Sequence, residues 1–242
     1  MPRWSELFDY PRAMINRVRL WWEAIDPADI RERMTDVNDG IIAVAGMGLG
    51  LAGAHVNATS TYLVVTLSAS VGALSVAGMQ LGEAFADREA VESIVAEERR
   101  LLELSPDEEL DELTEAFVAK GVSPATARAV AEELSASDAL SAQLEVEHGI
   151  REYISSRSAL TRGLAAGLAY LLGALIPLLT TILVPFQWHE EWSLLAALVA
   201  LTVTSLVLSR RGRSNMWATA ARSLGLGLVA FGIAYFFGDL LV

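Results

Sequence analysis

The chain contains no cysteine, which excludes disulfides, thiolate metal sites and thiol redox chemistry. Asp, Glu, Lys and Arg are absent from four long stretches, residues 40–82, 163–188, 192–209 and 223–238. A transmembrane helix needs about 20 apolar residues, so the first stretch can hold two spans and each of the others one. The sequence therefore predicts an all-α, multi-pass integral membrane protein with five transmembrane helices in a lipid bilayer.

Most of the unbalanced charge lies in one segment between the second and third predicted spans. Residues 87–149 hold 17 acidic and 5 basic residues, and their balance of −12 equals the net charge of the whole chain. Such a field attracts metal cations or a basic partner protein and repels nucleic acid. We expect this segment to be an acidic, water-facing helical domain without a nucleic-acid partner.

Helix signals divide the acidic segment. The second span should continue as a helix to about residue 104. Ser105-Pro106 and Ser123-Pro124 each place a capping residue before a proline suited to the first helical position. Gly121 is suited to end the helix between them, and Ser137-Asp138 to cap a further short helix.

Arginine marks one side of the membrane. The N-terminal region and residues 151–162 and 210–213 are basic, whereas the loop at residues 185–192 has no Lys or Arg. With five spans the basic segments share one side, which the positive-inside rule assigns to the cytoplasm, together with the acidic domain. The predicted organisation is an N-terminal amphipathic interfacial helix and linker (1–34), transmembrane helices 1–2 (35–86), the acidic cytoplasmic, metal-binding-like domain (87–150) and transmembrane helices 3–5 (151–242).

The amphipathic N-terminal stretch has two interpretations. Its apolar residues recur at three- and four-residue spacing and include three tryptophans, with arginines off the stripe. This pattern favours a helix lying in the membrane interface. Packing of the same stripe against the protein's own membrane domain is the alternative.

Ionisable and thioether side chains in the first two spans are candidates for an ion path. Asp39 begins span one and is either a functional carboxylate at membrane depth or a helix cap. Met79 and Glu83 are four residues apart and share a helix face, where they would suit a borderline-soft divalent ion. Simple packing of Met79 and a water boundary at Glu83 are the alternatives.

Carboxylates of the acidic segment form a second candidate site. Glu109 and Glu112 share a helix face, and Glu108 and Glu115 give further choices on the same helix. If the helices pack as a bundle, four more glutamates could converge on them: Glu97, Glu98, Glu145 and Glu147. Carboxylate clusters suit hard or borderline cations. The alternative is an ordinary solvated acidic surface, and His148 is likewise either a ligand or a surface histidine.

Two glycine pairs predict close helix packing. Gly46 and Gly50 in span one, and Gly78 and Gly82 in span two, have the spacing of small residues at helix–helix contacts. The contact could lie within the chain or between two copies of it.

These motifs, in this order, resemble the vacuolar iron transporter family. Asn38-Asp39-Gly40-Ile41-Ile42 opens a glycine-rich span, and Met79-Gln80-Leu81-Gly82-Glu83 is similar to the family's Ser-Met-Ala-Leu-Gly-Glu-Tyr run. An acidic insert follows, closed by Glu147-His148-Gly149-Ile150, which resembles the family's Glu-Leu-Gly-Leu. The resemblance covers roughly residues 35–242, including the five-span layout.

The resemblance implies a homodimeric, proton-coupled exporter of Fe²⁺, with Mn²⁺ as a further substrate, whose ion path lies between spans one and two of both subunits. Asp39 matches the pore carboxylate and Met79 the pore methionine. The cytoplasmic metal-binding glutamates are matched by Glu98, Glu109, Glu112 and Glu147. The membrane would be the cell membrane in a prokaryote and the vacuolar membrane in a eukaryote, and no prosthetic group is implied.

The sequence departs from the family pattern both around the second span and in the acidic domain. Non-family residues stand at six positions: Val71, Gly78, Ala84, Leu101, Gln143 and Leu144. The pore pair survives, so transport is the favoured interpretation, and the acidic site would be weaker or built from different carboxylates. The rival hypothesis is a membrane-anchored acidic interaction module without transport. An enzyme is not expected, because no phosphate loop, nucleophile elbow or cofactor fingerprint is present.

Overall fold

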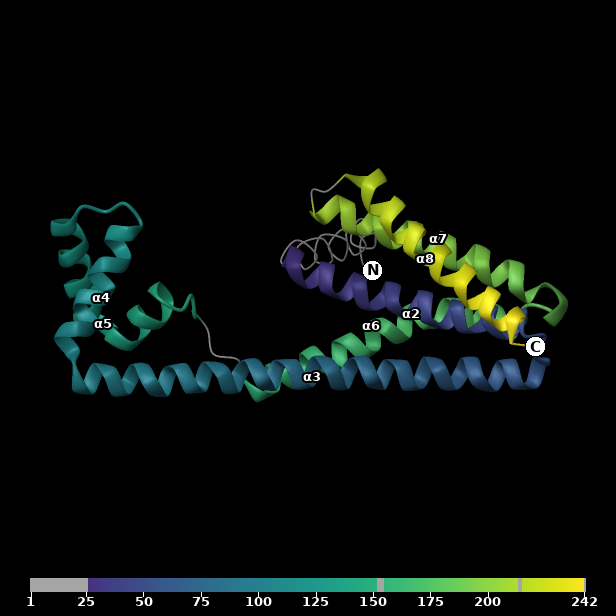
Figure 1. Cartoon of the computed structure of the whole chain (residues 1–242), viewed down its shortest axis with the longest axis horizontal. Coiled ribbons are helices and arrows are strands. Elements are labelled where there is room, and N and C mark those ends of the chain that lie inside the picture. The colour runs from purple at the N-terminus through teal and green to yellow at the C-terminus, as the bar shows by residue number, and fades with distance from the viewer. Residues whose placement is uncertain (1–25, 152–154, 213–214, 242) are drawn as a thin grey trace, which may run out of the picture. The chain divides into compact units, whose positions relative to one another are not determined.

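The computed structural model describes residues 26–151, 155–212 and 215–241, which contain helices and no strand, as the predicted all-α class requires. The predicted N-terminal interfacial helix lies outside the described residues. The α-helices, labelled in Figure 1, are α2 (Pro27–Gly53), α3 (Ala58–Leu104), α4 (Pro106–Ala119), α5 (Pro124–Val146), α6 (Ser156–Leu183), α7 (His189–Gly212) and α8 (Met216–Leu240). A 3₁₀ turn, η1 (Phe186–Trp188), precedes α7.

The chain divides into two compact units. The first, here called the membrane unit, comprises the chain up to Ala77 together with the part from Leu164 onward. The second, here called the acidic unit, is Gly78–Gly163. The acidic unit contains residues 87–150, the predicted acidic domain, together with the preceding turns of α3 and the start of α6.

Four helical segments in the described part of the chain are long and apolar enough to cross a membrane. They are α3, α6, η1 with α7 (Phe186–Arg210) and α8, and they match the second to fifth predicted spans. The helix α2 falls short because its charge-free part is only the 14 residues from Gly40 to Gly53, preceded by Asp36 and Asp39. The count of five spans therefore stays a prediction.

Helix α3 links the two units without a break. Its 47 residues, visible as one continuous helix in Figure 1, would extend about 70 Å at 1.5 Å per residue. It ends at Leu104, which confirms the predicted continuation of the second span. Charged residues begin at Glu83, so the half that carries them belongs in water.

Helix α2 is the centre of the membrane unit. One face, with Ile41, Ala45 and Leu49, packs against α7 and α8 around Leu201 and Phe231. Another face, through Val44, joins a second cluster. The members of that cluster from α3 and α6 are Val65, Ala69, Tyr170, Ala174 and Leu178. Because both clusters share α2, the membrane unit has one connected core, although the first half of this helix is rich in charged residues.

Glycines allow α2 to approach its neighbours at backbone distance. A Cβ at Gly40 would overlap the carbonyl oxygen of Tyr170 in α6, and a Cβ at Gly173 would overlap that of Val37 in α2. On α8, a Cβ at Gly238 would overlap the carbonyl oxygen of Gly50. Small residues are the usual means by which membrane helices gain packing contacts.

The two predicted glycine pairs have different outcomes. A Cβ at Gly50 would lie 3.2 Å from the carbonyl oxygen of Ala234, so this pair is used for packing within the chain. By contrast, a Cβ at Gly78 or Gly82 would meet no atom within 4 Å among the described residues. Within the described part of the chain, the second pair therefore has no packing partner.

The acidic unit is a small helical bundle whose boundaries follow its local sequence. Helix α4 begins after Ser105, and Gly121 follows its C-terminal end with φ +94°, a conformation that suits glycine. The hydroxyl of Ser123 accepts a hydrogen bond from Thr126 N at the start of α5. Within α5, Asp138 has non-helical dihedrals and accepts hydrogen bonds from Ser141 N (3.1 Å) and Oγ (2.7 Å). The predicted cap at this point is thus a kink within one longer helix.

The crossing of α2 and α6 can be tested with Gly173→Ala. The added methyl group must push the Val37 carbonyl away, so we expect a loss of about 1–3 kcal/mol in stability, as for other overpacked contacts. The measurement is the thermal unfolding midpoint of the purified protein in detergent. Gly225→Ala in α8 is the control, because its Cβ would meet nothing within 4 Å. Equal midpoints for the two variants would contradict the close crossing.

Candidate metal centre

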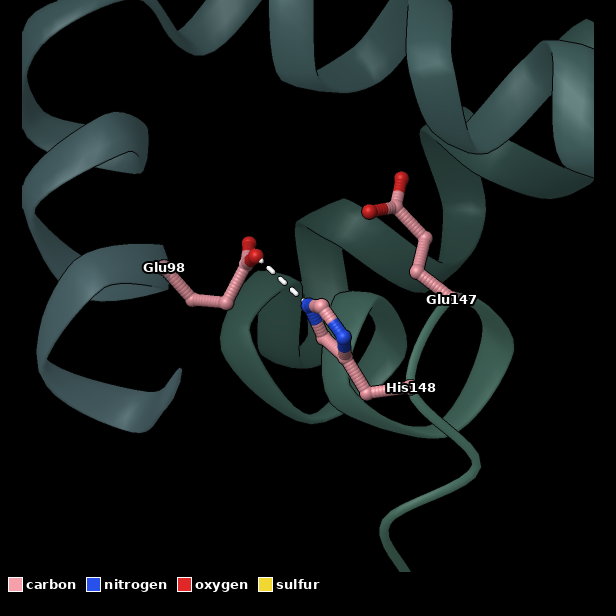
Figure 2. A group of neighbouring side chains, drawn as sticks. All are labelled: Glu98, Glu147 and His148. Atoms are coloured by element: carbon pink, nitrogen blue, oxygen red, sulfur yellow. Dashed lines mark hydrogen bonds and ion pairs between the residues drawn. The ribbon is translucent and has the colours of Figure 1, made fainter. Parts of the chain in front are cut away.

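Three side chains of the acidic unit converge on one point. Glu98 comes from α3, Glu147 is the C-terminal cap of α5, and His148 follows it. One potential ligand atom from each lies within 4.8 Å of the others (Figure 2). His148 Nε2 lies 2.8 Å from Glu98 Oε1. Two oxygen donors and one nitrogen donor therefore meet here, from segments about 50 residues apart in the chain.

A tight turn after α5 places His148. Glu147 N still donates to the Gln143 carbonyl (2.9 Å), but Gly149 adopts φ +68° and the chain reverses, so that Ile150 N donates to the Leu144 carbonyl (2.8 Å). Glycine takes this left-handed conformation with little strain. The turn leaves the imidazole directed at the Glu98 carboxylate, as Figure 2 shows.

Glu98 is the most confined of the three. Only 5% of the residue is exposed, and its Oε2 is buried without a hydrogen-bond partner in the part of the chain that the structure describes. A buried carboxylate oxygen without a partner is costly, because desolvation is not compensated. Such an oxygen is suited to accept a cation.

Glu109 lies next to this group and is also buried, with 4% of the residue exposed. Gln143 Nε2 donates to the Glu109 carbonyl (2.7 Å) and to its Oε2 (3.1 Å). Burial raises the pKa of Glu109, the carboxylates of Glu98, Glu112 and Glu147 raise it further, and the hydrogen bond from Gln143 opposes them. The three charged neighbours that shift this pKa are all acidic.

Glu147 has the same kind of surroundings. Its pKa is raised by burial first and then by Glu98 and Glu112, while His148 lowers it. The four glutamates named from the sequence, Glu98, Glu109, Glu112 and Glu147, thus lie in one neighbourhood of mutual repulsion. A divalent cation would relieve that repulsion, and carboxylates with an imidazole are a fitting ligand set for one.

Comparison with known protein families matches residues 30–239 to the VIT family. The chain belongs to this family, whose curated members here are vacuolar iron transporters. A vacuolar iron transporter of Acanthamoeba castellanii is 29% identical over 206 residues, covering 84% of this chain and 75% of that protein. Vacuolar iron transporter 1 of Tulipa gesneriana is 25% identical over 210 residues, covering 85% of this chain and 84% of that protein.

The membrane-depth candidates of this VIT family member occupy two different units. Asp39 is an exposed residue of α2 in the membrane unit, one residue after Asn38, whose Oδ1 accepts a hydrogen bond from Thr204 Oγ1 (2.5 Å). Met79, 63% exposed, and Glu83, also exposed, lie on the part of α3 that belongs to the acidic unit. Their roles stay predictions.

Two residues of the acidic site were undervalued by sequence reasoning. In the sequence, Gln143 was noted only as a departure from the family pattern, yet its side chain donates a hydrogen bond to the Glu109 carbonyl. Its four-residue spacing from Glu147 puts both residues on one face of α5 and could have indicated that it belongs to the site. His148 was left open as a ligand or a surface group, and its position beside Glu98 could not be read from α5 alone. In the membrane unit, buried Asp36 was also missed; it pairs with Arg33 at 2.9 Å.

The mutual repulsion of the glutamates can be tested with Glu109→Gln. Because folding raises the pKa values of Glu109 and Glu147, protonation stabilises the folded unit. That contribution is complete below the unfolded pKa of about 4.5 and is lost as the pH rises through the raised values. At pH 7.5 in the presence of a chelator, Glu109→Gln should therefore increase the hydrogen-exchange protection of α4 in the full-length protein, by about 1.4 kcal/mol for each pKa unit by which folding raises the pKa of Glu109.

Glu108→Gln is the matched control for this experiment. Both residues lie in the first turn of α4 and interact with the same helix dipole, but Glu108 is exposed. The difference between the variants therefore isolates the buried carboxylate. If Glu109→Gln protects α4 no more than Glu108→Gln does, the repulsion is not significant.

Proposed function

We propose that this protein is a proton-coupled transporter that moves Fe²⁺, with Mn²⁺ as a further substrate, out of the cytosol across a membrane. Membership of the VIT family supports metal-ion transport, and four apolar helices support a membrane location. The observation that carries the proposal is the carboxylate–imidazole group of the acidic unit, in which buried Glu98 meets Glu147 and His148 and a second buried glutamate, Glu109, lies close by.

In this proposal the acidic unit collects the ion. Its charge balance of −12 over residues 87–149 would raise the local concentration of divalent cations. A bound cation would then offset the repulsion among four carboxylates by attracting each of them: Glu98, Glu109, Glu112 and Glu147. The distribution of arginines supports a cytoplasmic location for the acidic segment of this unit, residues 87–150.

Asp39 and Met79 would form the path through the membrane. A thioether and a carboxylate can replace part of the hydration shell of Fe²⁺, which accepts softer ligands than Mg²⁺ or Ca²⁺ do. A proton and a metal ion would compete for Asp39, since either neutralises a carboxylate that has lost its water. That competition would couple the outward movement of metal to the inward movement of protons.

The exposed apolar face of α3 supports a homodimer. Leu63, Leu67, Val71 and Leu74 are all exposed, and Gly78 and Gly82 continue this helix with room for a neighbour. A second copy packing on α3 would supply the contact that the spacing of these glycines favours. With α2 as the first of five spans, this arrangement would place the ion path between the two copies.

Transport through Asp39 is tested by Fe²⁺ uptake into proteoliposomes, with and without an imposed proton gradient. We expect Asp39→Asn to lower gradient-driven uptake roughly tenfold or more, because a lost contact to a charged ligand is worth about 1.5–3 kcal/mol. Asp29→Asn is the control, since it makes the same change in the exposed first turn of α2. Mn²⁺ competes for uptake if it is a second substrate.

The rival function predicts the opposite pattern. A membrane-anchored binding module would keep its activity in Asp39→Asn and Met79→Leu and lose it when the glutamates of the acidic unit are changed. Folded protein that takes up neither Fe²⁺ nor Mn²⁺ would contradict the transport proposal and favour this rival.

A further inference from the structure

We propose that His148 is a metal ligand, and that it makes the site of the acidic unit a mixed nitrogen–oxygen site selective for borderline transition ions over hard ions. This inference rests on the proposed function only in assuming that the acidic unit binds metal. It adds a specificity-determining residue that the family-type motif, with leucine at this position, does not contain.

The spacing of the donors fits a metal. His148 Nε2 and Glu98 Oε1 are 2.8 Å apart, close to the distance of about 3 Å between neighbouring ligands of an ion with bonds of about 2.1 Å. Glu147 offers a third donor within 4.8 Å of both. Small side-chain rotations would therefore place one nitrogen and two oxygens around a common ion.

The hydrogen bond to His148 satisfies only one of the two carboxylate oxygens of Glu98. His148 can bond one oxygen of the carboxylate, but Glu98 Oε2 is buried and has no partner among the described residues. Buried polar atoms are nearly always paired in native proteins, so this oxygen calls for a partner, and an ion or a water molecule is one that fits. A metal bound by Glu98 and His148 together would account for this atom.

Two positions near Glu98 lack the potential ligands of the family pattern, and His148 would compensate for this loss. Leu101 and Leu144 stand where the family pattern has potential ligands, and Leu144 is buried at 2% exposure. Gln143 is bonded to Glu109 through its amide nitrogen. His148 supplies a donor from the end of the same helix α5, so the number of ligands near Glu98 is partly restored.

The ligand type determines which ions are favoured. Imidazole binds Fe²⁺, Co²⁺, Ni²⁺ and Zn²⁺ well, whereas sites with oxygen ligands alone suit Mg²⁺, Ca²⁺ and Mn²⁺. Neutral imidazole adds affinity without adding charge, so the two carboxylates still balance a divalent ion. Removing His148 should therefore weaken the binding of borderline ions and leave that of hard ions nearly unchanged.

The test uses the full-length protein in detergent, with any affinity tag removed, and two probes, Co²⁺ and Ca²⁺. We expect His148→Leu to lower Co²⁺ affinity about tenfold or more, the loss of one good ligand contact, while Ca²⁺ affinity changes less than about twofold. Glu145→Gln is the control, because this exposed residue lies two positions from Glu147 and pairs with Arg151 instead. A proportional loss of Co²⁺ and Ca²⁺ affinity, or no loss of either, overturns the proposal.

X-ray absorption of the Fe²⁺-loaded protein gives a second readout. Scattering from an imidazole ring should be present in the wild type and absent in His148→Gln, a variant that can still hydrogen-bond Glu98 and so keep the fold. Unchanged imidazole scattering overturns the proposal. The transport proposal fails separately. If the wild type takes up no Fe²⁺ but His148→Leu still weakens Co²⁺ binding more than Ca²⁺ binding, transport alone is overturned. If the wild type takes up Fe²⁺ but His148→Leu changes both affinities equally, the role of His148 alone is overturned.

Discussion

The close approach of α2 to its neighbours is the contact on which the membrane unit depends. Lipid is as apolar as the side chains of these helices, so hydrophobic burial adds little to their association and packing must replace it. Gly40 against α6 and Gly50 against Gly238 of α8 bring backbones together and gain that packing. In the middle of α2, next to Gly40, Asn38 accepts a hydrogen bond from Thr204 of α7, and Asp39 follows. A helix with six charged residues in its first half is thus held at the centre of an apolar bundle.

The acidic unit is organised by a different balance. A small apolar core around Leu113, Ala131 and Ala142 joins α4 to α5, and buried glutamates adjoin it. The repulsion among those glutamates lowers the stability of the metal-free unit, since charged groups near one another and away from water raise each other's free energy. A bound cation would remove that cost, so in the proposed function the low stability of the free unit and its affinity for metal would have one physical origin.

Local sequence signals were sufficient for most helix boundaries. The proline after Ser105, the glycine at 121 and the continuation of the second span to residue 104 each depend on neighbouring residues only, and the structure agrees with them. Asp138 was correctly placed as a cap, but whether the chain starts a new helix or kinks within one depends on packing. Hydropathy alone could not decide whether α2 crosses the membrane. Because α2 packs against α7 and α8, it can carry polar residues that a lipid-facing helix would exclude.

The sequence by itself determined that the chain is helical, that four segments are apolar enough for a membrane, and that one acidic segment lies between them, because composition and turn residues act over short distances. Tertiary structure alone decided which carboxylates meet. Glu98 and His148 are joined only by the packing of α3 with the end of α5 and by the turn at Gly149. It also decided which glycines are used, since Gly50 contacts a backbone and Gly78, with the same spacing pattern, contacts nothing in the described chain. Distances between segments far apart in sequence are set by side-chain packing, which no local pattern encodes.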